Sequence, residues 1–351
     1  MADLATTYMG LTLKNPLIVA SSSLTGNLEG VKQAAASGAG AVVLKSLFEE
    51  QIAAETANLS QHAADAGHTE AAEYLQGYGA ALGPETYLQL IKDSVAAVDV
   101  PVIASLNCFS RDSWVDYARK IESAGAAALE LNIGLLPTRS GQQGRAIEER
   151  YYQILHQVKS ALKIPVALKI GPYFSSLAEV AATLGNDRAQ APTFTVGWCG
   201  PGETTPKIVW RKADALVLFN RFYQLDIDIE KMEIVAGNPL SSPAEITGAL
   251  RWMALLHKRV ASDLAATTGI HEGRDVIKQL LAGATVTQVC STLMKNGFAQ
   301  IGRILTDVET WMEQKGFTRI DQFRGRLSQA NSSHPQEFER LQYIKLFVGL
   351  E

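Results

Sequence analysis

The 351-residue sequence has few cysteines and no long apolar run. Its three cysteines, Cys108, Cys199 and Cys290, are far apart and form no Cys-x-x-Cys pair. This spacing excludes a disulfide framework and an iron–sulfur or zinc site built from cysteine. No apolar stretch approaches the roughly 18–20 residues that cross a bilayer, and residues 1–8 lack a signal-peptide pattern. We therefore expect a cytoplasmic protein with no membrane partner.

The sequence also lacks an excess of charge of one sign. Its formal net charge is -4 and it contains no run of like charges, which gives no electrostatic reason to expect a nucleic-acid partner. Walker, G-x-G-x-x-G and G-x-S-x-G motifs are absent. Hydrophobic residues make up 47%, enough for a large core, and we expect one domain over residues 1–351.

What the sequence does contain is a repeated step from a helix end to an apolar strand, as in Ser37-Gly-Ala-Gly-Ala-Val-Val-Leu-Lys45. Glycine ends a helix without a Cβ clash, and a short continuous apolar run is typical of a parallel strand covered on both faces. Proline opens two further strands, where its missing N–H does least harm. The eight strand candidates are 17–20, 37–45, 101–104, 123–132, 165–168, 212–220, 260–265 and 281–289.

Helices are expected between most of these strands. Ser242 with Glu245, and Ser176 with Glu179, have the spacing of capping boxes that open helices. Eight strands alternating with helices predict an α/β fold, a (β/α)8 TIM barrel. Residues 50–84 form an excursion between strands 2 and 3 that we interpret either as a lid or as a surface helical pair, and residues 186–212 form an irregular insertion between strands 5 and 6.

In such a barrel the active site lies where the strands end. Lysine and asparagine side chains at these ends indicate an anionic or polar ligand, because a buried ammonium needs a partner. The last two ends enter helices and are typical phosphate positions, although ordinary N-cap hydroxyls would also explain them. The residues at the eight ends are Ser21; Lys45 and Ser46; Ser105 and Asn107; Asn132; Lys169; Asn220 and Arg221; Thr268 and Gly269; and Ser291 and Thr292.

Three further polar residues receive plainer interpretations. His271 lies in a loop beside Glu272, and we interpret it as a surface residue rather than a ligand. Asp226 and Asp228 alternate with apolar residues in what reads as a solvated strand. We predict no metal site.

At the strand ends the chain resembles the dihydroorotate dehydrogenase family, in its soluble class. The resemblance covers the chain apart from residues 186–212. The similar segments are Asn15-Pro16 leading into Ala20-Ser21-Ser22, Lys45-Ser46, Asn132, Lys169 with Pro172-Tyr173-Phe174, Asn220, and Gly237-Asn238.

The resemblance implies an FMN-dependent oxidoreductase that acts on a CH–CH group of a small molecule. Dihydroorotate, oxidised to orotate in pyrimidine biosynthesis, or a related compound would be the substrate, and the protein would be a homodimer. The implied cofactor-binding residues are Ala20, Ser21, Ser22, Lys45, Ser46, Ser105, Asn132, Lys169, Gly237, Asn238, Thr268, Gly269, Ser291 and Thr292. The implied substrate-binding residues are Lys45, Tyr78, Gly79, Asn132 and Asn220, and the implied catalytic residues are Lys45, Asn132 and Thr138.

The chain departs from the family pattern in the loop after strand 4. Leu135 stands where the family carries a catalytic cysteine or serine, and leucine cannot take a proton. Pro137 replaces the family's second asparagine, and Thr138 or Tyr78 would have to supply the base. Two alternatives therefore stay open. One is a flavin-binding homologue that does not turn over dihydroorotate, and the other is a Schiff-base aldolase that uses Lys45 or Lys169.

Overall fold

The computed structural model describes residues 2–49, 51, 83–108, 114–135, 138, 140–187, 211–221 and 224–339. Eight parallel strands pair in the order β3–β4–β6–β7–β8–β9–β12–β13, and β13 pairs with β3, so the sheet closes. The predicted (β/α)8 barrel is confirmed. Its strands are β3 (Leu17–Val19), β4 (Ala41–Val43), β6 (Val102–Cys108), β7 (Ala128–Ile133), β8 (Val166–Ile170), β9 (Ala215–Leu218), β12 (Asp263–Thr267) and β13 (Val286–Val289).

Each of the eight strand candidates overlaps one of these strands, but four candidates end before the strand does: 101–104, 123–132, 165–168 and 260–265. The candidate at 260–265 corresponds to β12, which starts only at Asp263. The backbone N–H groups of Ala261 and Ser262 both donate to the Gly185 carbonyl instead of a neighbouring strand. A short strand, β5 (Leu47–Phe48), adds to the barrel by pairing with β6.

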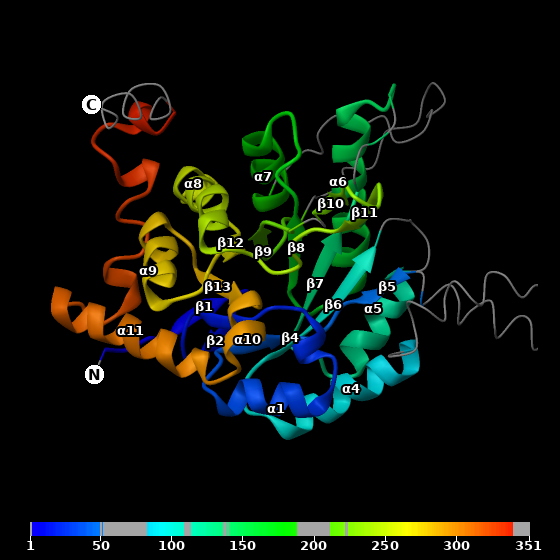
Figure 1. Cartoon of the computed structure of the whole chain (residues 1–351), viewed down its shortest axis with the longest axis horizontal. Coiled ribbons are helices and arrows are strands. Elements are labelled where there is room, and N and C mark those ends of the chain that lie inside the picture. The colour runs from blue at the N-terminus through cyan, green and yellow to red at the C-terminus, as the bar shows by residue number, and fades with distance from the viewer. Residues whose placement is uncertain are drawn as a thin grey trace, which may run out of the picture.

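A helix follows each barrel strand and packs on the outside of the sheet (Figure 1). None of the described helices is both long enough and apolar enough to cross a membrane. Of the two predicted irregular stretches, residues 50, 52–82 and 188–210 lie outside the described residues. The helices are α1 (Leu28–Ala36), α4 (Pro84–Ala97), α5 (Trp114–Ser123), α6 (Gly144–Ala161), α7 (Leu177–Gly185), α8 (Ile246–Leu256), α9 (Gly273–Ala282), α10 (Ser291–Asn296) and α11 (Gln300–Lys315).

The predicted helix starts at Ser242 and Ser176 are both present. A 3-10 turn, η2 (Pro243–Glu245), leads into α8, and the Glu245 carboxylate accepts a 2.7 Å hydrogen bond from the Ser242 backbone N–H. Ser176 is the N-cap residue of α7, although its side chain makes no capping bond. A carboxylate at the first turn satisfies an N–H that the helix itself leaves unpaired.

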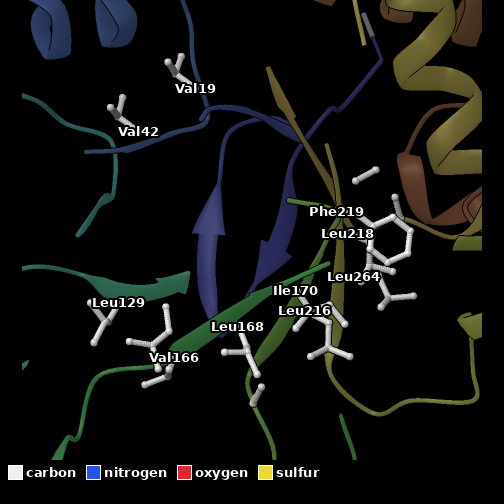
Figure 2. Close-up of a cluster of buried hydrophobic side chains, with 14 of the residues drawn as sticks. Val19, Val42, Leu129, Val166, Leu168, Ile170, Leu216, Leu218, Phe219 and Leu264 are labelled. Atoms are coloured by element: carbon white, nitrogen blue, oxygen red, sulfur yellow. The ribbon is translucent and has the colours of Figure 1, made fainter. Parts of the chain in front are cut away.

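Alternation along the strands separates two apolar cores, because successive side chains point to opposite faces of a sheet. The outer core lies between strands and helices and contains Leu129, Val166, Leu168, Leu216 and Leu264 (Figure 2). The inner core contains side chains of the opposite parity, which point into the barrel. The strand residues of the inner core are Ile18, Ala41, Val43, Ile103, Ala128, Ala167, Ala215, Val217, Ala265 and Val286.

An N-terminal hairpin fills the space that these small inward side chains leave. Strands β1 (Thr6–Tyr8) and β2 (Leu11–Leu13) pair antiparallel, and Tyr8, Met9 and Leu13 belong to the inner core. The Met9 backbone N–H donates to the Asp263 carboxylate at 2.7 Å, which ties the hairpin to the start of β12. The hairpin thereby closes the end of the barrel where the strands begin.

A second hairpin follows β9 and is largely exposed. Strands β10 (Leu225–Asp228) and β11 (Glu233–Ala236) pair antiparallel, so the predicted solvated strand at Asp226 and Asp228 is confirmed. The hairpin also carries an exposed apolar surface, in which Leu225, Ile227 and Ile234 share the strand face opposite Asp226 and the other members lie in the turn. The residues of this surface and their exposed fractions are Leu225 62%, Ile227 58%, Ile229 78%, Met232 87% and Ile234 74%. We call this set the hairpin apolar face.

Candidate functional site

A cavity of about 220 Å³ lies at the end of the barrel where the strands finish. Its lining comes from the last residues of β8, β12 and β13 and from the segments that follow β3, β9, β11, β12 and β13, so it joins segments that are distant in the sequence. We call it the strand-end cavity. Seven of the predicted site residues lie in its lining: Ala20, Ser21, Lys169, Asn220, Thr268, Gly269 and Ser291.

Lys169 points into the barrel from β8 and is only 9% exposed. Its Nζ lies 3.8 Å from the Oε1 of Glu130, a β7 residue that is 1% exposed. The Gln288 side chain on β13 donates a 2.6 Å hydrogen bond to the other Glu130 oxygen, Oε2. Within the described residues, Glu130 Oε1 and Gln288 Oε1 accept no hydrogen bond. The cavity floor therefore combines the Lys169 ammonium with the unused Gln288 Oε1, and the Glu130 carboxylate lies beneath them.

Ser21 is held in place by two serines behind it. The Ser21 and Ser46 hydroxyls are 3.0 Å apart, and the Ser46 hydroxyl lies 2.8 Å from that of Ser105. Tyr87 fixes the Ser105 backbone, because its hydroxyl donates to the Ser105 carbonyl and accepts from the Ser105 N–H. Burial raises the pKa of Tyr87, so its hydroxyl stays protonated. Ser46 and Ser105 support the cavity wall without belonging to its described lining.

Lys45 and Lys169 share one end of the barrel, because each lies at the carboxyl side of its strand. Only Lys169 belongs to the described lining of the strand-end cavity. The aliphatic part of the Lys45 side chain packs against the loop after β3. A Cβ added to Gly26 in that loop would lie 3.2 Å from the Lys45 Cδ. Ser22 lies in the same loop, with its backbone N–H 3.4 Å from the Thr25 hydroxyl.

Two asparagines meet at the mouth of the barrel. The Asn220 side chain donates a 2.8 Å hydrogen bond to the Asn132 side-chain oxygen, which joins the ends of β9 and β7. Thr138 is exposed in the loop after β7. Tyr78 and Gly79, the other predicted substrate residues, lie outside the described residues.

Gly237 and Asn238 shape a segment beside the cavity. The Gly237 N–H donates to the Gln224 carbonyl, and a Cβ at Gly237 would lie 2.5 Å from that oxygen. Arg221 holds the same segment, since its guanidinium donates to the Asn238 carbonyl at 2.9 Å and to Glu245 at 2.7 Å. These contacts hold residues 237–242 close to the start of α8.

Ser241 connects the loops that end three strands. Its backbone N–H donates to the Ser291 hydroxyl at 2.9 Å, and its own hydroxyl accepts from the Gly269 N–H at 3.3 Å. The Lys295 ammonium donates to the Ser241 carbonyl at 3.1 Å. Backbone N–H groups, hydroxyls and an ammonium are the groups that proteins use to hold a phosphate.

The interpretation of His271 as a surface residue is wrong. Its side chain is 8% exposed, and its Nε2 lies 3.4 Å from the Ser241 hydroxyl. The backbone draws it inward, because the His271 carbonyl accepts from the Thr292 hydroxyl and its N–H donates to Asp275. Burial, with the nearby charge of Lys295, lowers the pKa of His271. The described residues contain no group of side chains that could hold a metal ion.

Thr268 and Gly269 make an unusual turn at the end of β12. Both have positive φ angles, 74° and 75° respectively, and the first is a β-branched residue. Such a residue rarely adopts this left-handed conformation because its Cβ crowds the backbone. A Cβ at Gly269 would lie 2.2 Å from the Ile246 backbone nitrogen, so glycine permits this close approach to α8.

A second cavity of about 330 Å³ adjoins the first. The two share Asn220, Arg221 and Thr268, and the second is also lined by Tyr173 and Trp252. Binding sites for small molecules commonly combine such aromatic walls with a few polar groups.

Leu135 supplies no acid–base group at the family's catalytic position. Its side chain packs against the outer core, and the adjacent Ile133 carbonyl accepts a 3.0 Å hydrogen bond from the Tyr151 hydroxyl. Burial raises the pKa of Tyr151 to about 12, so this hydroxyl stays a donor. Pro137 lies outside the described residues.

Glu130, Gln288 and Ser241 were not identified from the sequence. The first two carried a usable signal, because each is a polar residue within a continuous apolar strand. Alternation places Glu130 on the same face as Asn132, two residues later. Ser241 carried no such signal, since its role depends on three loops meeting in space.

Comparison with known proteins points to one family. The family model described as dihydroorotate dehydrogenase matches residues 3–190. The catalytic subunit of dihydroorotate dehydrogenase B (NAD(+)) from Thermoplasma acidophilum is 26% identical over 330 residues, which cover 93% of this chain and 99% of that protein. The proteins of the same name from Desulforudis audaxviator and Staphylococcus carnosus are 27% and 25% identical, and the matches cover 96% and 98% of them and 92% and 93% of this chain.

Proposed function

The chain belongs to the dihydroorotate dehydrogenase family, and we propose that it is a cytoplasmic FMN-dependent oxidoreductase. Its substrate would be a small molecule with an oxidisable CH–CH bond, dihydroorotate of pyrimidine biosynthesis or a related ring. The supporting observation is the strand-end cavity, which has the buried Lys169 ammonium at its floor. No carboxylate is found among the described residues that line it, so the cavity suits an anionic ligand.

The residues of the cavity fit FMN. Ala20, Ser21 and Lys169 would contact the flavin ring, and Ser241, Gly269 and Ser291 would hold the phosphate. Gln288 Oε1 is a buried polar atom with no hydrogen-bond partner among the described residues, as expected at the floor of a cavity that takes a polar ligand. The bound flavin would accept the hydride. Lys169 would then stabilise the negative charge that reduction leaves on the ring, as a preorganised ammonium does in a site that excludes water.

Asn132 and Asn220 would bind the substrate. Their side chains meet at the barrel mouth and offer amide donors and acceptors in fixed positions. We propose that Lys45, at the same end of the barrel, holds an anionic group of the substrate and the edge of the flavin. Thr138 is the proposed base, because Leu135 cannot serve.

Lys169→Ala is expected to abolish flavin binding. The reason is that Lys169 supplies the ammonium at the cavity floor. The measurement is the visible absorption spectrum of purified protein, with released flavin identified by chromatography. Lys120→Ala, on the outer helix α5, is the matched control and keeps the cofactor. Wild-type protein that is colourless and takes up no FMN would refute the proposed cofactor.

Leu135→Cys is expected to speed flavin reduction by dihydroorotate. A general base typically contributes 10²- to 10⁴-fold, and a thiol loses its proton far more readily than the Thr138 hydroxyl, so we expect the anaerobic reduction to accelerate by about 100-fold. Stopped-flow absorbance measures the rate, and Leu135→Ala is the control for space alone. Equal rates in the cysteine and alanine variants would show that a thiol at position 135 adds nothing to the proposed base Thr138. Rapid reduction by a related compound but not by dihydroorotate would identify the related substrate, whereas bound flavin that neither reduces would favour the flavin-binding homologue without turnover.

We also propose that two copies of the chain associate through the hairpin apolar face. Monomeric proteins rarely expose contiguous apolar surface, and five large side chains lie together here. A twofold axis would bring the same face of each copy together, as in most homodimers. The double variant Ile227→Asp and Ile234→Asp should be monomeric by sedimentation equilibrium, whereas Leu327→Asp, elsewhere on the surface, should stay dimeric. A monomeric wild type would count against this, and would leave the hairpin to a different subunit.

A further inference from the structure

We propose that Glu130 is a positioning residue that sets the reduction potential of the flavin through Lys169. The inference rests on the proposed cofactor and concerns a residue beneath the cavity rather than in its lining. The observation behind it is the buried row of side chains formed by Glu130, Lys169 and Gln288. We call this row the barrel triad.

The register of the sheet brings the barrel triad together. Glu130 pairs in register with Ala167, and Asn132 with Lys169, so the carboxylate of β7 lies one level below the ammonium of β8. All three side chains point into the barrel, between the apolar inner core below and the strand-end cavity above. Their exposed fractions are 1% for Glu130, 9% for Lys169 and 1% for Gln288.

The contacts fix the carboxylate in one orientation. Gln288 donates to Oε2 at 2.6 Å, which leaves Oε1 facing the Lys169 Nζ at 3.8 Å. That separation is too long for a hydrogen bond but close for an ion pair. Lys169 thus keeps its N–H donors for the cavity while a negative charge sits directly behind it. A buried carboxylate is costly unless paired, so the barrel triad is a specific arrangement of charge.

This arrangement weakens the field of Lys169 at the cavity. An ammonium alone favours a ligand that gains negative charge, whereas an ammonium backed by a carboxylate favours it less. Reduction places negative charge on the flavin, so Glu130 makes reduction harder and lowers the reduction potential. Gln288 moderates the effect, because a hydrogen-bond donor draws charge from the carboxylate.

The test measures the midpoint potential of the flavin in the purified holoprotein by dye-coupled anaerobic reduction. Glu130→Gln keeps the shape and removes the charge, and we expect a more positive potential. The two-electron reduction constant should rise about tenfold, the order of one unit charge acting across roughly 10 Å of protein. Tenfold corresponds to about 30 mV for a two-electron couple. Glu130→Asp retains the charge and should stay near wild type.

Gln288→Leu gives a second measurement should Glu130→Gln lose its fold. It keeps both charges and removes the donor to Oε2, so the potential should become more negative. Asp263→Asn is the control, because it removes another barrel carboxylate at the opposite end and should leave the potential unchanged. Shifts of opposite sign in the Glu130 and Gln288 variants support the inference, since a general loss of packing would not produce them.

Two results would overturn the inference. One is a Glu130→Gln variant that binds flavin with an unchanged or more negative potential. The other is a Gln288→Leu variant whose potential does not fall. Failure of the proposed cofactor is distinguishable, because the wild type itself would then bind no FMN and have no flavin potential to measure.

Discussion

Thr268 occupies a backbone conformation that suits glycine. The family prefers two glycines at this turn, and here threonine takes the first position while keeping a φ of 74°. The left-handed region costs an L-residue about 1–2 kcal/mol. Strain of this kind persists only where the surroundings impose it, and it concentrates at binding sites. The adjacent Gly269 shares the positive φ, and a Cβ there would lie 2.2 Å from the Ile246 backbone nitrogen.

At position 268 a glycine variant should therefore be more stable than an alanine variant, the reverse of the usual order of stability. At an ordinary position glycine is less stable than alanine by roughly 0.5–1 kcal/mol, because it loses more entropy on folding. Here Thr268→Gly should exceed Thr268→Ala in unfolding free energy by about 1 kcal/mol, since it relieves the left-handed strain. Urea unfolding of the two apo proteins measures the difference. Alanine equal to or above glycine would mean that the turn relaxes in solution.

Among single residues, those that follow an apolar strand were the most predictable. Lys169 and Asn220 were found because their polarity contrasts with the buried run before them. Lys45 was found for the same reason but lies beside the cavity rather than in its described lining, because its stem follows the loop after β3. Position along a strand therefore predicted which end of the barrel a residue occupies, but not where its side chain goes.

At the scale of elements, the segment after α11 packs back across the barrel helices. The Gly325 N–H donates to the Leu280 carbonyl at 2.8 Å, and the Leu327 N–H to that of Leu281 at 2.9 Å. The His257 ring at the end of α8 lies directly against this segment. A Cβ added to Gly325 would come within 2.2 Å of the ring nitrogen Nε2. Figure 1 shows the segment in red beside α8 and α9. The packing leaves the imidazole partly cut off from water.

Acid should weaken this attachment. Burial lowers the pKa of His257 below its ordinary value of about 6.5, so the folded state disfavours the charged ring. The contribution of the neutral His257 ring to the free energy of unfolding is then complete above pH 6.5, and it is lost as the pH falls through the lower pKa of the folded state. Unfolding free energies at pH 7.5 and 5.0 should show a smaller loss for His257→Asn than for wild type. His334→Gln, in an exposed position, should lose as much as wild type.

Elements that repeat were predictable, whereas the strand pairings that occur once were not, although alternation did identify the strand at Asp226 and Asp228. Each of the eight strand candidates overlaps a barrel strand, because glycine or proline before a short apolar run marks most of the helix-to-strand steps. The pairing of β1 with β2, and of β10 with β11, gave no such signal, since two strands of three or four residues form no repeat. The start of β12 was misplaced for a related reason, because backbone bonds to Gly185 depend on a distant helix end.

At the scale of the whole molecule, the order of the strands predicted the closed sheet and the end that carries the site. Parallel strands with helical crossovers have few ways to pack, so the pattern was sufficient. The interior was less predictable. The barrel triad combines residues from β7, β8 and β13, and its geometry follows from the register around the barrel rather than from any local pattern.

The N-terminal hairpin has a consequence for how the chain folds during synthesis. The hydrogen bond between Met9 and Asp263 spans 254 residues, so the hairpin is synthesised early and the barrel that encloses it is completed late. At about 5–20 residues per second, the ribosome takes roughly 13–50 s to supply the intervening chain. Until then the apolar residues of the first two strands have no completed barrel to enter, and they are candidates for protection by a chaperone. A circular permutant that places this hairpin after the last helix would remove the delay.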